Sequence, residues 1–316
     1  IADATDAALL GALAIAGRED AERWGTERAR VAFVAMGRYG GRECSYASDA
    51  DVIALHEPVG GASDSEAAAS ATAIVNRVKK LLGSATSQLG IVVDLDLRPE
   101  GKNGPMSRTI ASHEEYAQRW ASTWERQAAV RARPIGDGEL AQAARSLFES
   151  MAYRQVSESE VRDIRLLKAR MENERLPRGT EPARHVKLGP GGLSDVEWTI
   201  QLIQMRHGRE VEALRTSSTT DAIAAARDAG LLGASDAEIL LNAWDLATRI
   251  RAGNTLATGR MSGVKLDVVP RDSAELGALA AILGYGSGGL TALEEDWLRA
   301  ARQARGVMER TFWEQQ

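Results

Sequence analysis

The stretch Gly40-Gly41-Arg42-Glu43, followed by Ser48-Asp49-Ala50-Asp51, decides the fold of the first part of this chain. Apolar, strand-like runs at residues 31–35 and 52–55 lie on either side of it. Side chains alternate along a strand, so we expect Asp49 and Asp51 on one face. Carboxylate oxygens suit Mg²⁺, which usually binds one or two of them together with substrate phosphates. The stretch therefore predicts a site for a metal-bound nucleotide.

The glycine pair fits the same site, because glycine lets backbone N–H groups approach a phosphate closely. We therefore expect Gly40 and Gly41 to face the phosphates of the nucleotide. A third carboxylate is predicted on the strand-like run at residues 91–97, where Asp94 is the candidate and Asp96 follows on the same face. Three carboxylates around two metal ions suit in-line attack on phosphorus, one metal activating the hydroxyl and the other neutralising the leaving pyrophosphate. The alternative for residues 48–51 is a loop with solvated carboxylates.

Composition narrows the class of protein. The chain has 316 residues, 44% of them apolar, and a formal net charge of −5, which argues against a general nucleic-acid binder. Its one cysteine, Cys44, excludes an intrachain disulfide and a thiolate metal cluster. No apolar run is long enough to span a bilayer and no signal-peptide pattern opens the chain, so we expect a cytoplasmic protein that binds neither membrane nor nucleic acid. Because the chain begins at Ile1 rather than methionine, we expect a fragment or a processed product.

The periodicity of apolar residues predicts an α+β fold in two domains. Residues 1–136 are expected to form a catalytic domain with an N-terminal helix (residues 3–24), a small mixed sheet and further helices. Residues 137–316, where strand signals nearly vanish, are expected to form an all-α helical bundle. The other helices predicted in the first domain are 65–89, 112–120 and 124–133. Capping boxes predict helix starts at four pairs: Ser112/Glu115, Ser157/Glu160, Ser235/Glu238 and Thr291/Glu294.

Five blocks, in order, resemble the glutamine synthetase adenylyltransferases, a family within the DNA polymerase β-like nucleotidyltransferase superfamily. Together they are highly specific, whereas the glycine pair with its two aspartates alone would indicate only the superfamily. The family patterns are G-[KR]-x-G-G-x-E, SDxD, VDxRLRP, TWExQA…[VIL]RAR and [ND]-[IL]-K…GG[IL]xD[IV]E[FW]. In this chain they match residues 37–43, 48–51, 93–99, 123–133 and 185–198.

The resemblance implies transfer of AMP from ATP to a tyrosine hydroxyl of glutamine synthetase, with Mg²⁺ as cofactor. Full-length members of the family carry two catalytic halves, one adding AMP and one removing it by phosphorolysis. Residues 123–127 and 55–58 look more like the adding, C-terminal half, and the removing half stays as the alternative. The family also implies the PII signal protein as a partner. The alternative from another class is a non-catalytic module that senses nucleotide and docks signalling proteins.

Roles follow for the candidate site residues. Asp49, Asp51 and Asp94 would hold Mg²⁺, and Asp94 would also accept the tyrosine proton. Asp96 stands where the family has arginine; it either joins the metal site or pairs with a nearby arginine. The expected nucleotide-binding residues are Arg38, Gly40, Gly41, Ser48 and Lys187, the last reaching in from the second domain.

For the remaining residues both a functional and a structural interpretation are open. Arg98, Arg131 and Arg133 either contact phosphate or pair with local acids. Cys44 is expected to be a packed residue, and His56 is expected to lie in a loop. The tryptophans Trp120, Trp124 and Trp297 are expected in the core rather than stacked on a base.

Overall fold

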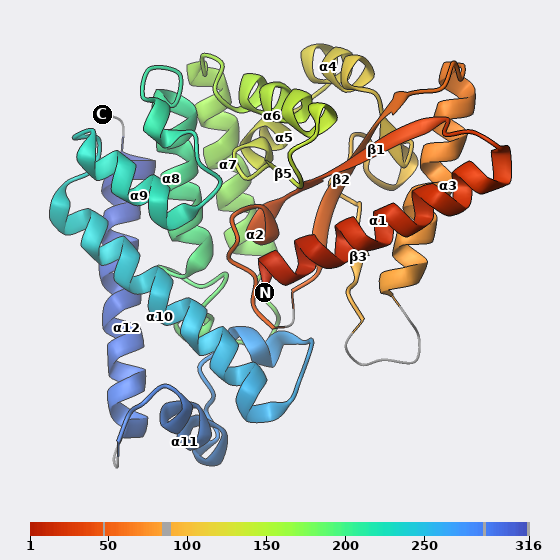
Figure 1. Ribbon diagram of the computed structural model, residues 1–316. Helices are drawn as coiled ribbons and strands as arrows, with labels where there is room; N and C mark the ends of the chain where they lie inside the picture. The colour runs from red at the N-terminus through yellow and green to blue at the C-terminus, as the bar shows by residue number, and fades with distance from the viewer. Residues whose placement is uncertain (47, 84–89, 287–288, 315–316) are drawn as a thin grey trace. The chain divides into compact units, whose positions relative to one another are not determined.

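The computed structural model describes residues 1–46, 48–83, 90–286 and 289–314, which divide into two units (Figure 1). The first unit comprises Ile1–Cys44, Ser48–Arg154 and Thr216–Ser218, and the second comprises Ser45–Ala47, Gln155–Arg215 and Thr219–Gln316. The first unit thus extends beyond the predicted boundary at residue 136. The reason is that the helix α6 (Glu139–Ala152) packs on the strands of that unit.

The first unit is built on a small mixed sheet. β1 pairs antiparallel with β2 and with β5, whereas β3 and β4 each run parallel to β2. The strands are β1 (Ala29–Ala35), β2 (Ala50–Pro58), β3 (Val93–Asp94), β4 (Ser107–Arg108) and β5 (Arg133–Pro134). The strands predicted at 31–35 and 52–55 are confirmed, and both are longer than expected.

Two long helices cover one face of this sheet, as Figure 1 shows. They are α1 (Ala2–Trp24) and α3 (Asp64–Leu82), which confirms the helices predicted near 3–24 and from 65 onward; residue 89, the predicted end of the second, lies outside the described residues. The sheet side chains in this core alternate along each strand, Phe33 and Ala35 on β1 and Val52 and Ala54 on β2. Odd-numbered residues of β2 therefore face away from α1 and α3, toward the face on which α4 (Ile110–Arg119) and α6 pack.

Helix starts agree only partly with the predicted capping boxes. The box at Ser157 is confirmed, because its side chain caps α7 (Glu158–Glu174) and Glu160 bonds back to it. The box at Ser112 is wrong: Thr109 caps α4, and its hydroxyl accepts the Ser112 N–H at 3.1 Å. The capping boxes predicted at Ser235 and Thr291 are also wrong, since both residues lie inside helices rather than before them.

The region around Trp120 and Trp124 differs most from expectation. The helix predicted over 124–133 is α5 (Thr123–Ala129), which ends early because the chain then turns into β5. Trp120 ends α4 with 74% of its surface exposed, and Trp124 is 43% exposed on α5, so the expected core position is wrong for both. Trp297, in the second unit, is fully buried as expected.

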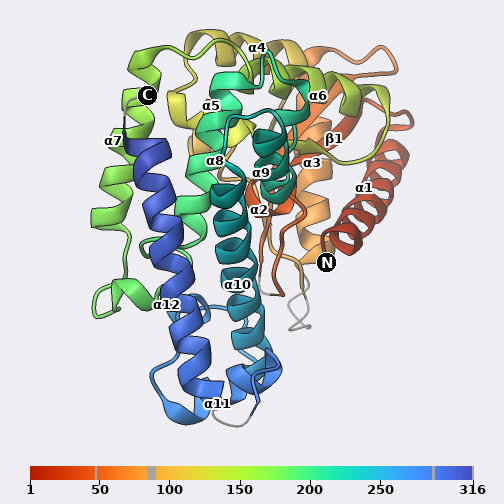
Figure 2. The ribbon, with the colours of Figure 1, turned by 90° about the vertical axis from the view of Figure 1, so that its left-hand side faces the viewer.

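The second unit is helical, with one isolated bridge between His185 and Val268 among its described residues. Its longest helices, α10 and α12, pack along one another (Figure 2) and supply much of the apolar core. The helices are α7, α8 (Leu193–His207), α9 (Thr219–Asp228), α10 (Ala234–Thr258), α11 (Ser273–Ile282) and α12 (Gly289–Met308). None of the helices described in either unit is long and apolar enough to cross a bilayer.

Candidate functional site

The pairing of β2 with β3 brings two of the predicted metal ligands together. In the parallel register, Asp51 lies directly opposite Asp94, with Ala50 opposite Val93. Neighbouring strands lie about 4.8 Å apart, and side chains at paired positions leave the sheet on the same face. Asp49, two residues before Asp51, lies just outside β2. Asp51 and Asp94 thus leave the sheet on the face away from α1 and α3, and Asp49 lies in the segment that leads into β2.

The side chains at this edge are accessible to a ligand. Asp49 is exposed, and Asp51 and Asp94 are half-buried. Asp94 accepts the backbone N–H of Asp96 on Oδ1 at 2.7 Å, and its Oδ2 has no hydrogen bond within the described residues. Among the described residues, no three His, Cys, Asp or Glu side chains are close enough to hold a metal ion together. The backbone therefore fits a carboxylate metal site, and the convergence of the side chains stays a prediction.

Asp96 does not share a face with Asp94 as the sequence suggested. β3 ends at Asp94 and the chain turns at residue 96, so the alternation of a strand no longer applies. The exposed Asp96 carboxylate lies 3.2 Å from Lys102 Nζ and 3.9 Å from Arg98 Nη1. Of the two alternatives for this residue, the structure favours the local ion pair.

The glycine turn packs against the protein itself. A Cβ on Gly40 would overlap the carbonyl oxygen of Arg131 and lie 2.7 Å from that of Ala35. The N–H of Gly40 donates to the Met36 carbonyl at 2.8 Å, and that of Gly41 donates to the Gly37 carbonyl at 3.2 Å. These two amides are thus already used inside the helical turn α2 (Gly37–Gly40), so the expected reason for the glycines is corrected: they permit the close packing against Arg131.

Two arginines that follow α5 hold this turn in place. Arg131, which is 3% exposed in its side chain, pairs with Glu43, and its Nε donates to the Gly37 carbonyl at 3.2 Å. Arg133 donates from Nε to the Gly40 carbonyl at 3.0 Å and binds both carboxylate oxygens of Asp6, at 2.8 and 3.0 Å. The alternative of pairing with local acids is therefore the one observed for both arginines.

Tyr39 and Arg98 complete this framework. The Tyr39 hydroxyl donates to Asp6 at 2.6 Å, and burial, aided by this hydrogen bond, raises the pKa of the phenol well above its usual value. Arg98 is buried and donates to three backbone carbonyls of the loop after β3, those of Leu95, Lys102 and Gly104. It orders that loop, so its phosphate-binding alternative has no support in the structure.

Arg38 belongs to the α2 turn, and the Asp51 carboxylate lies next to that turn at Gly37. Burial raises the pKa of the Cys44 thiol, the Arg38 guanidinium opposes that rise, and the Asp51 carboxylate adds to it. Asp51 also packs on the turn, since a Cβ on Gly37 would lie 3.4 Å from its Oδ2. A cation and a carboxylate thus lie next to the α2 turn, where the sequence placed the triphosphate.

Lys187 belongs to the second unit, where it is exposed on the loop that precedes α8. Ser48, half-buried, lies in the segment that leads into β2. His56 is buried in β2 and its Nδ1 lies 2.9 Å from the Ser107 hydroxyl of β4, so it is a sheet residue rather than the expected loop residue.

Two family models match the chain. One, described as glutamate-ammonia ligase adenylyltransferase, matches residues 1–147, and the other, described as GlnD PII-uridylyltransferase, matches residues 165–312. A bifunctional glutamine synthetase adenylyltransferase/adenylyl-removing enzyme of Streptomyces coelicolor is 45% identical over 99% of this chain. The chain belongs to the family of glutamine synthetase adenylyltransferase/adenylyl-removing enzymes. Apart from residues 216–218, the second match lies within the helical second unit, and apart from residues 45–47 the first match lies within the first unit.

Other relatives carry the same name. The protein of Streptomyces avermitilis is 46% identical over 99% of the chain, and that of Mycobacterium marinum is 40% identical over 97%. In each of these three relatives the aligned region covers only 31% of the relative's length. The chain therefore spans about a third of the length of the curated relatives that it matches.

Three residues that hold the α2 turn or the loop before α8 were not among the predicted site residues. Asp6 lies on α1, 127 residues before the arginine that it binds, and no local pattern marks it. Glu43 stands in the glycine motif (residues 37–43), and its partner Arg131 stands in the block at 123–133. The presence of both residues in family motifs was the available signal for their pairing. His185, in the second unit, opens the block that contains Lys187, and its buried position was not foreseen.

Proposed function

We propose that this chain transfers AMP from ATP to a tyrosine hydroxyl of glutamine synthetase. The tyrosine oxygen attacks the α-phosphorus, the bond to the bridging oxygen breaks, and pyrophosphate leaves. The observation that carries the proposal is the register that sets Asp51 opposite Asp94, beside a turn that holds Arg38. The names of the relatives agree with this reaction, which needs ATP and therefore fits a cytoplasmic protein.

Asp49, Asp51 and Asp94 would hold Mg²⁺, because carboxylate oxygens from neighbouring strand positions suit a hard cation. Bound there, the metal would neutralise charge on the phosphates as the bond to pyrophosphate breaks. Asp94 is the proposed acceptor of the tyrosine proton, through the oxygen that does not bind the Asp96 N–H.

The chain's own donors would hold the triphosphate. Arg38 is the proposed cation, and Ser48, just before Asp49, contributes a hydroxyl. Because Gly40 and Gly41 use their N–H groups within the turn, the proposed backbone donors are the amides of residues 37–39. They belong to the first turn of α2, where N–H groups have no partner within the helix. Lys187 of the second unit is the proposed additional cation.

The test is transfer of label from α-labelled ATP to glutamine synthetase, with Mg²⁺ present. Transfer should be abolished in the Asp49→Asn/Asp51→Asn double variant, because both changes remove carboxylate charge without changing side-chain size. Asp64→Asn, an exposed change in the first turn of α3, serves as the matched control. No transfer by folded wild-type protein contradicts the proposal, and unaltered regulation by the double variant supports the non-catalytic module instead.

The second candidate is removal of AMP by phosphorolysis, because the relatives' names include the removal of adenylyl groups. In that reaction a phosphate oxygen attacks the phosphorus of the adenylylated tyrosine, the tyrosine oxygen leaves, and ADP forms. Incubation with adenylylated glutamine synthetase and inorganic phosphate tests it. ADP release without any transfer from ATP assigns the chain to the removing half.

For the second unit we propose a helical bundle that docks the PII signal protein. Its support is the match of residues 165–312 to a model described as GlnD PII-uridylyltransferase, together with the continuous core of α8 to α12. Titration of the full chain with PII, followed by calorimetry, tests the docking. Absence of binding with and without ATP and glutamine contradicts it.

A further inference from the structure

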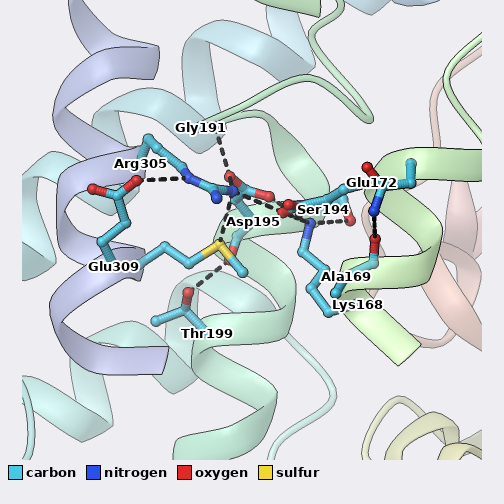
Figure 3. Close-up of polar contacts among 11 residues, drawn as sticks. Lys168, Ala169, Glu172, Gly191, Ser194, Asp195, Thr199, Arg305 and Glu309 are labelled. Carbon is cyan, nitrogen blue, oxygen red and sulfur yellow. Dashed lines mark hydrogen bonds and ion pairs between the residues drawn. The ribbon is translucent and has the colours of Figure 1, made fainter. Parts of the chain in front are cut away.

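The charged cluster at the junction of α7, α8 and α12 is balanced within the second unit (Figure 3). Lys168 Nζ lies 2.5 Å from Asp195 Oδ1 and 3.1 Å from Glu172, and Lys168 and Asp195 are each 1% exposed. Arg305 lies 2.7 Å from Glu172 and 3.1 Å from Asp195. These charges match one another, so the cluster gives no reason to expect a ligand.

The first unit has the opposite feature, two large apolar side chains that nothing covers. Trp120 is 74% exposed, more than any other large apolar side chain described, and Trp124 is 43% exposed. Trp24 is similarly exposed at 44%, but the guanidinium carbon of Arg28 lies 4.1 Å from its ring centre. Within the part of the chain that the structure describes, Trp120 and Trp124 make no such contact and no ring–ring contact. Isolated exposed apolar residues are common, whereas two tryptophans within five positions are typical of a binding surface.

The junction of α4 and α5 that presents the two tryptophans is firmly held. Glu125 accepts the backbone N–H of Ser122 at 2.8 Å and forms a capping box with it. The other oxygen of Glu125 accepts the Tyr116 hydroxyl at 2.8 Å, which ties the start of α5 to α4. Arg126, which is 2% exposed, donates to the Met151 carbonyl at 3.0 Å and so ties α5 to the end of α6. Tryptophans on a fixed backbone lose little conformational freedom on binding, which suits them as anchors.

The two tryptophans belong to the layer of helices on the side of the sheet where Asp51 and Asp94 emerge. α4 and α5 both pack on α6, and α4 and α6 pack on that face of the sheet. Trp124 lies near the start of α5, which has seven residues and is about 10 Å long. Arg131, two residues after the end of α5, packs against the α2 turn. A standard protein interface covers about 800 Å² on each partner, a patch roughly 30 Å across, so one partner can span the tryptophans and the carboxylates.

The chemistry of the patch favours a protein as its occupant. Glu115 and Arg119, the charged neighbours of Trp120 on α4, pair with each other at 2.7 Å. The patch therefore does not favour the phosphates of a nucleotide or an anionic lipid surface. Tryptophans are enriched among the residues that contribute most to protein–protein binding.

We propose that Trp120 and Trp124 dock the protein that supplies the acceptor hydroxyl, which is glutamine synthetase in the proposed function. The proposal rests on that function for the identity of the partner. The two tryptophans contact neither ATP nor the reacting atoms; they hold the protein substrate so that its tyrosine stays near Asp51 and Asp94. The rival occupants are the second unit of this chain and a second copy of the chain.

The test is the affinity of the full chain for glutamine synthetase, measured by surface plasmon resonance without ATP, together with the KM for glutamine synthetase in AMP transfer. Trp120→Ala/Trp124→Ala should raise both about thirtyfold, as the loss of interface anchors does, and leave the Kd for MgATP within twofold. Trp120→Phe/Trp124→Phe keeps aromatic rings and should recover most of the affinity. Trp24→Ala is the matched control and should change neither value, because Trp24 is as exposed as Trp124 but lies on α1, which covers the other face of the sheet.

Several outcomes overturn the proposal. They are absence of binding by wild type, an unchanged Kd in the double alanine variant, and an equal loss in Trp24→Ala. Wild-type affinity with faster hydrogen exchange in the helices of the second unit assigns the tryptophans to that unit, and a dimer that only the double variant dissociates assigns them to a second copy; either result also overturns it. If the double alanine variant does not fold, the single change Trp120→Ala at the more exposed position decides.

The two readouts also separate this inference from the proposed function. Binding that depends on the two tryptophans without any AMP transfer removes the proposed function alone. Normal transfer with a KM for glutamine synthetase that is insensitive to both tryptophans removes this inference alone.

Discussion

Replacing Gly40 by alanine distinguishes the two reasons for the glycine pair. If the glycine exists so that a phosphate can approach, the added methyl group weakens nucleotide binding and leaves the fold intact. If it exists because the turn packs on the backbone after α5, the methyl group destabilises the first unit. The structure supports the second reason, since the new Cβ would overlap the Arg131 carbonyl and lie 2.7 Å from that of Ala35.

The expected loss of stability is large because both obstacles are backbone atoms. Extra methyl groups in a packed interior typically cost about 1–3 kcal/mol when side chains can move aside. Neither carbonyl can rotate away here: Ala35 is paired in β1, and Arg131 is held by Glu43 and by the Gly37 carbonyl. We therefore expect Gly40→Ala to lower the free energy of unfolding of the first unit by about 3 kcal/mol or more.

Gly11→Ala is the matched control. Gly11 lies within α1, and a Cβ there would have no atom within 4 Å. Alanine at such a position should raise stability by about 0.5–1 kcal/mol, because glycine loses more backbone freedom in a helix. Two units need not unfold together, so the assay should follow hydrogen exchange of peptides from β1 and β2 across a urea series.

One result would refute the packing argument. If Gly40→Ala unfolds within about 1 kcal/mol of wild type while its KM for ATP rises, the methyl group has been accommodated by the protein and opposes the nucleotide instead. The contact with Arg131 would then not be the constraint that requires glycine. Reduced stability together with unchanged ATP affinity in the folded fraction supports the packing reason.

Three further predictions concern the carboxylates, the buried ion pair and pH. Asp94→Asn should lower kcat/KM for AMP transfer at least a hundredfold with an unchanged Tm, whereas Asp96→Asn should change it less than threefold; labelled-ATP kinetics on both variants decides this. Arg131→Met should cost about 3–5 kcal/mol in urea unfolding because it leaves Glu43 buried without its cation, and adding Glu43→Gln should recover part of the loss. Burial lowers the pKa of His113 from 6.5 to about 4. Between these pH values the imidazole is therefore protonated in the unfolded chain and neutral in the native state. Unfolding free energy should therefore fall by about 3 kcal/mol between pH 6.5 and 4, and His113→Phe, which keeps a ring against Phe148, should remove that part of the slope in unfolding experiments at several pH values.

The positions of the carboxylates could be predicted because they depend on local rules. The expectation of a third strand with Asp94 is confirmed by its pairing with Asp51. The shared face that strand alternation gives Asp49 and Asp51 stays a prediction, because β2 begins at Ala50. The same rule failed at Asp96, because β3 ends after two residues and alternation holds only while a strand continues. The length of a strand depends on its partner, which a single sequence does not show.

The partners of the arginines could not be predicted, because they lie far apart in the chain. Asp6 and Arg133 are separated by 127 residues, and only the packing of α1 beside the sheet brings them together. Periodicity in the same way placed Trp120 and Trp124 in a core, because helical spacing marks a possible inner face without showing what covers it. Both side chains are exposed where α4 ends and α5 begins.

The candidate site depends on the register of β3, a strand of only two residues. Its backbone hydrogen bonds are too few to set this register alone. Val93 and Leu95, on either side of Asp94, are 5% and 2% exposed and pack in the core beneath α1 and α3. A slip of one residue would bury the carboxylate and expose both apolar neighbours, since side chains alternate. Burying two such side chains contributes several kcal/mol, more than the few hydrogen bonds of β3. The core under the sheet, rather than the chemistry above it, therefore sets where Asp94 meets Asp51.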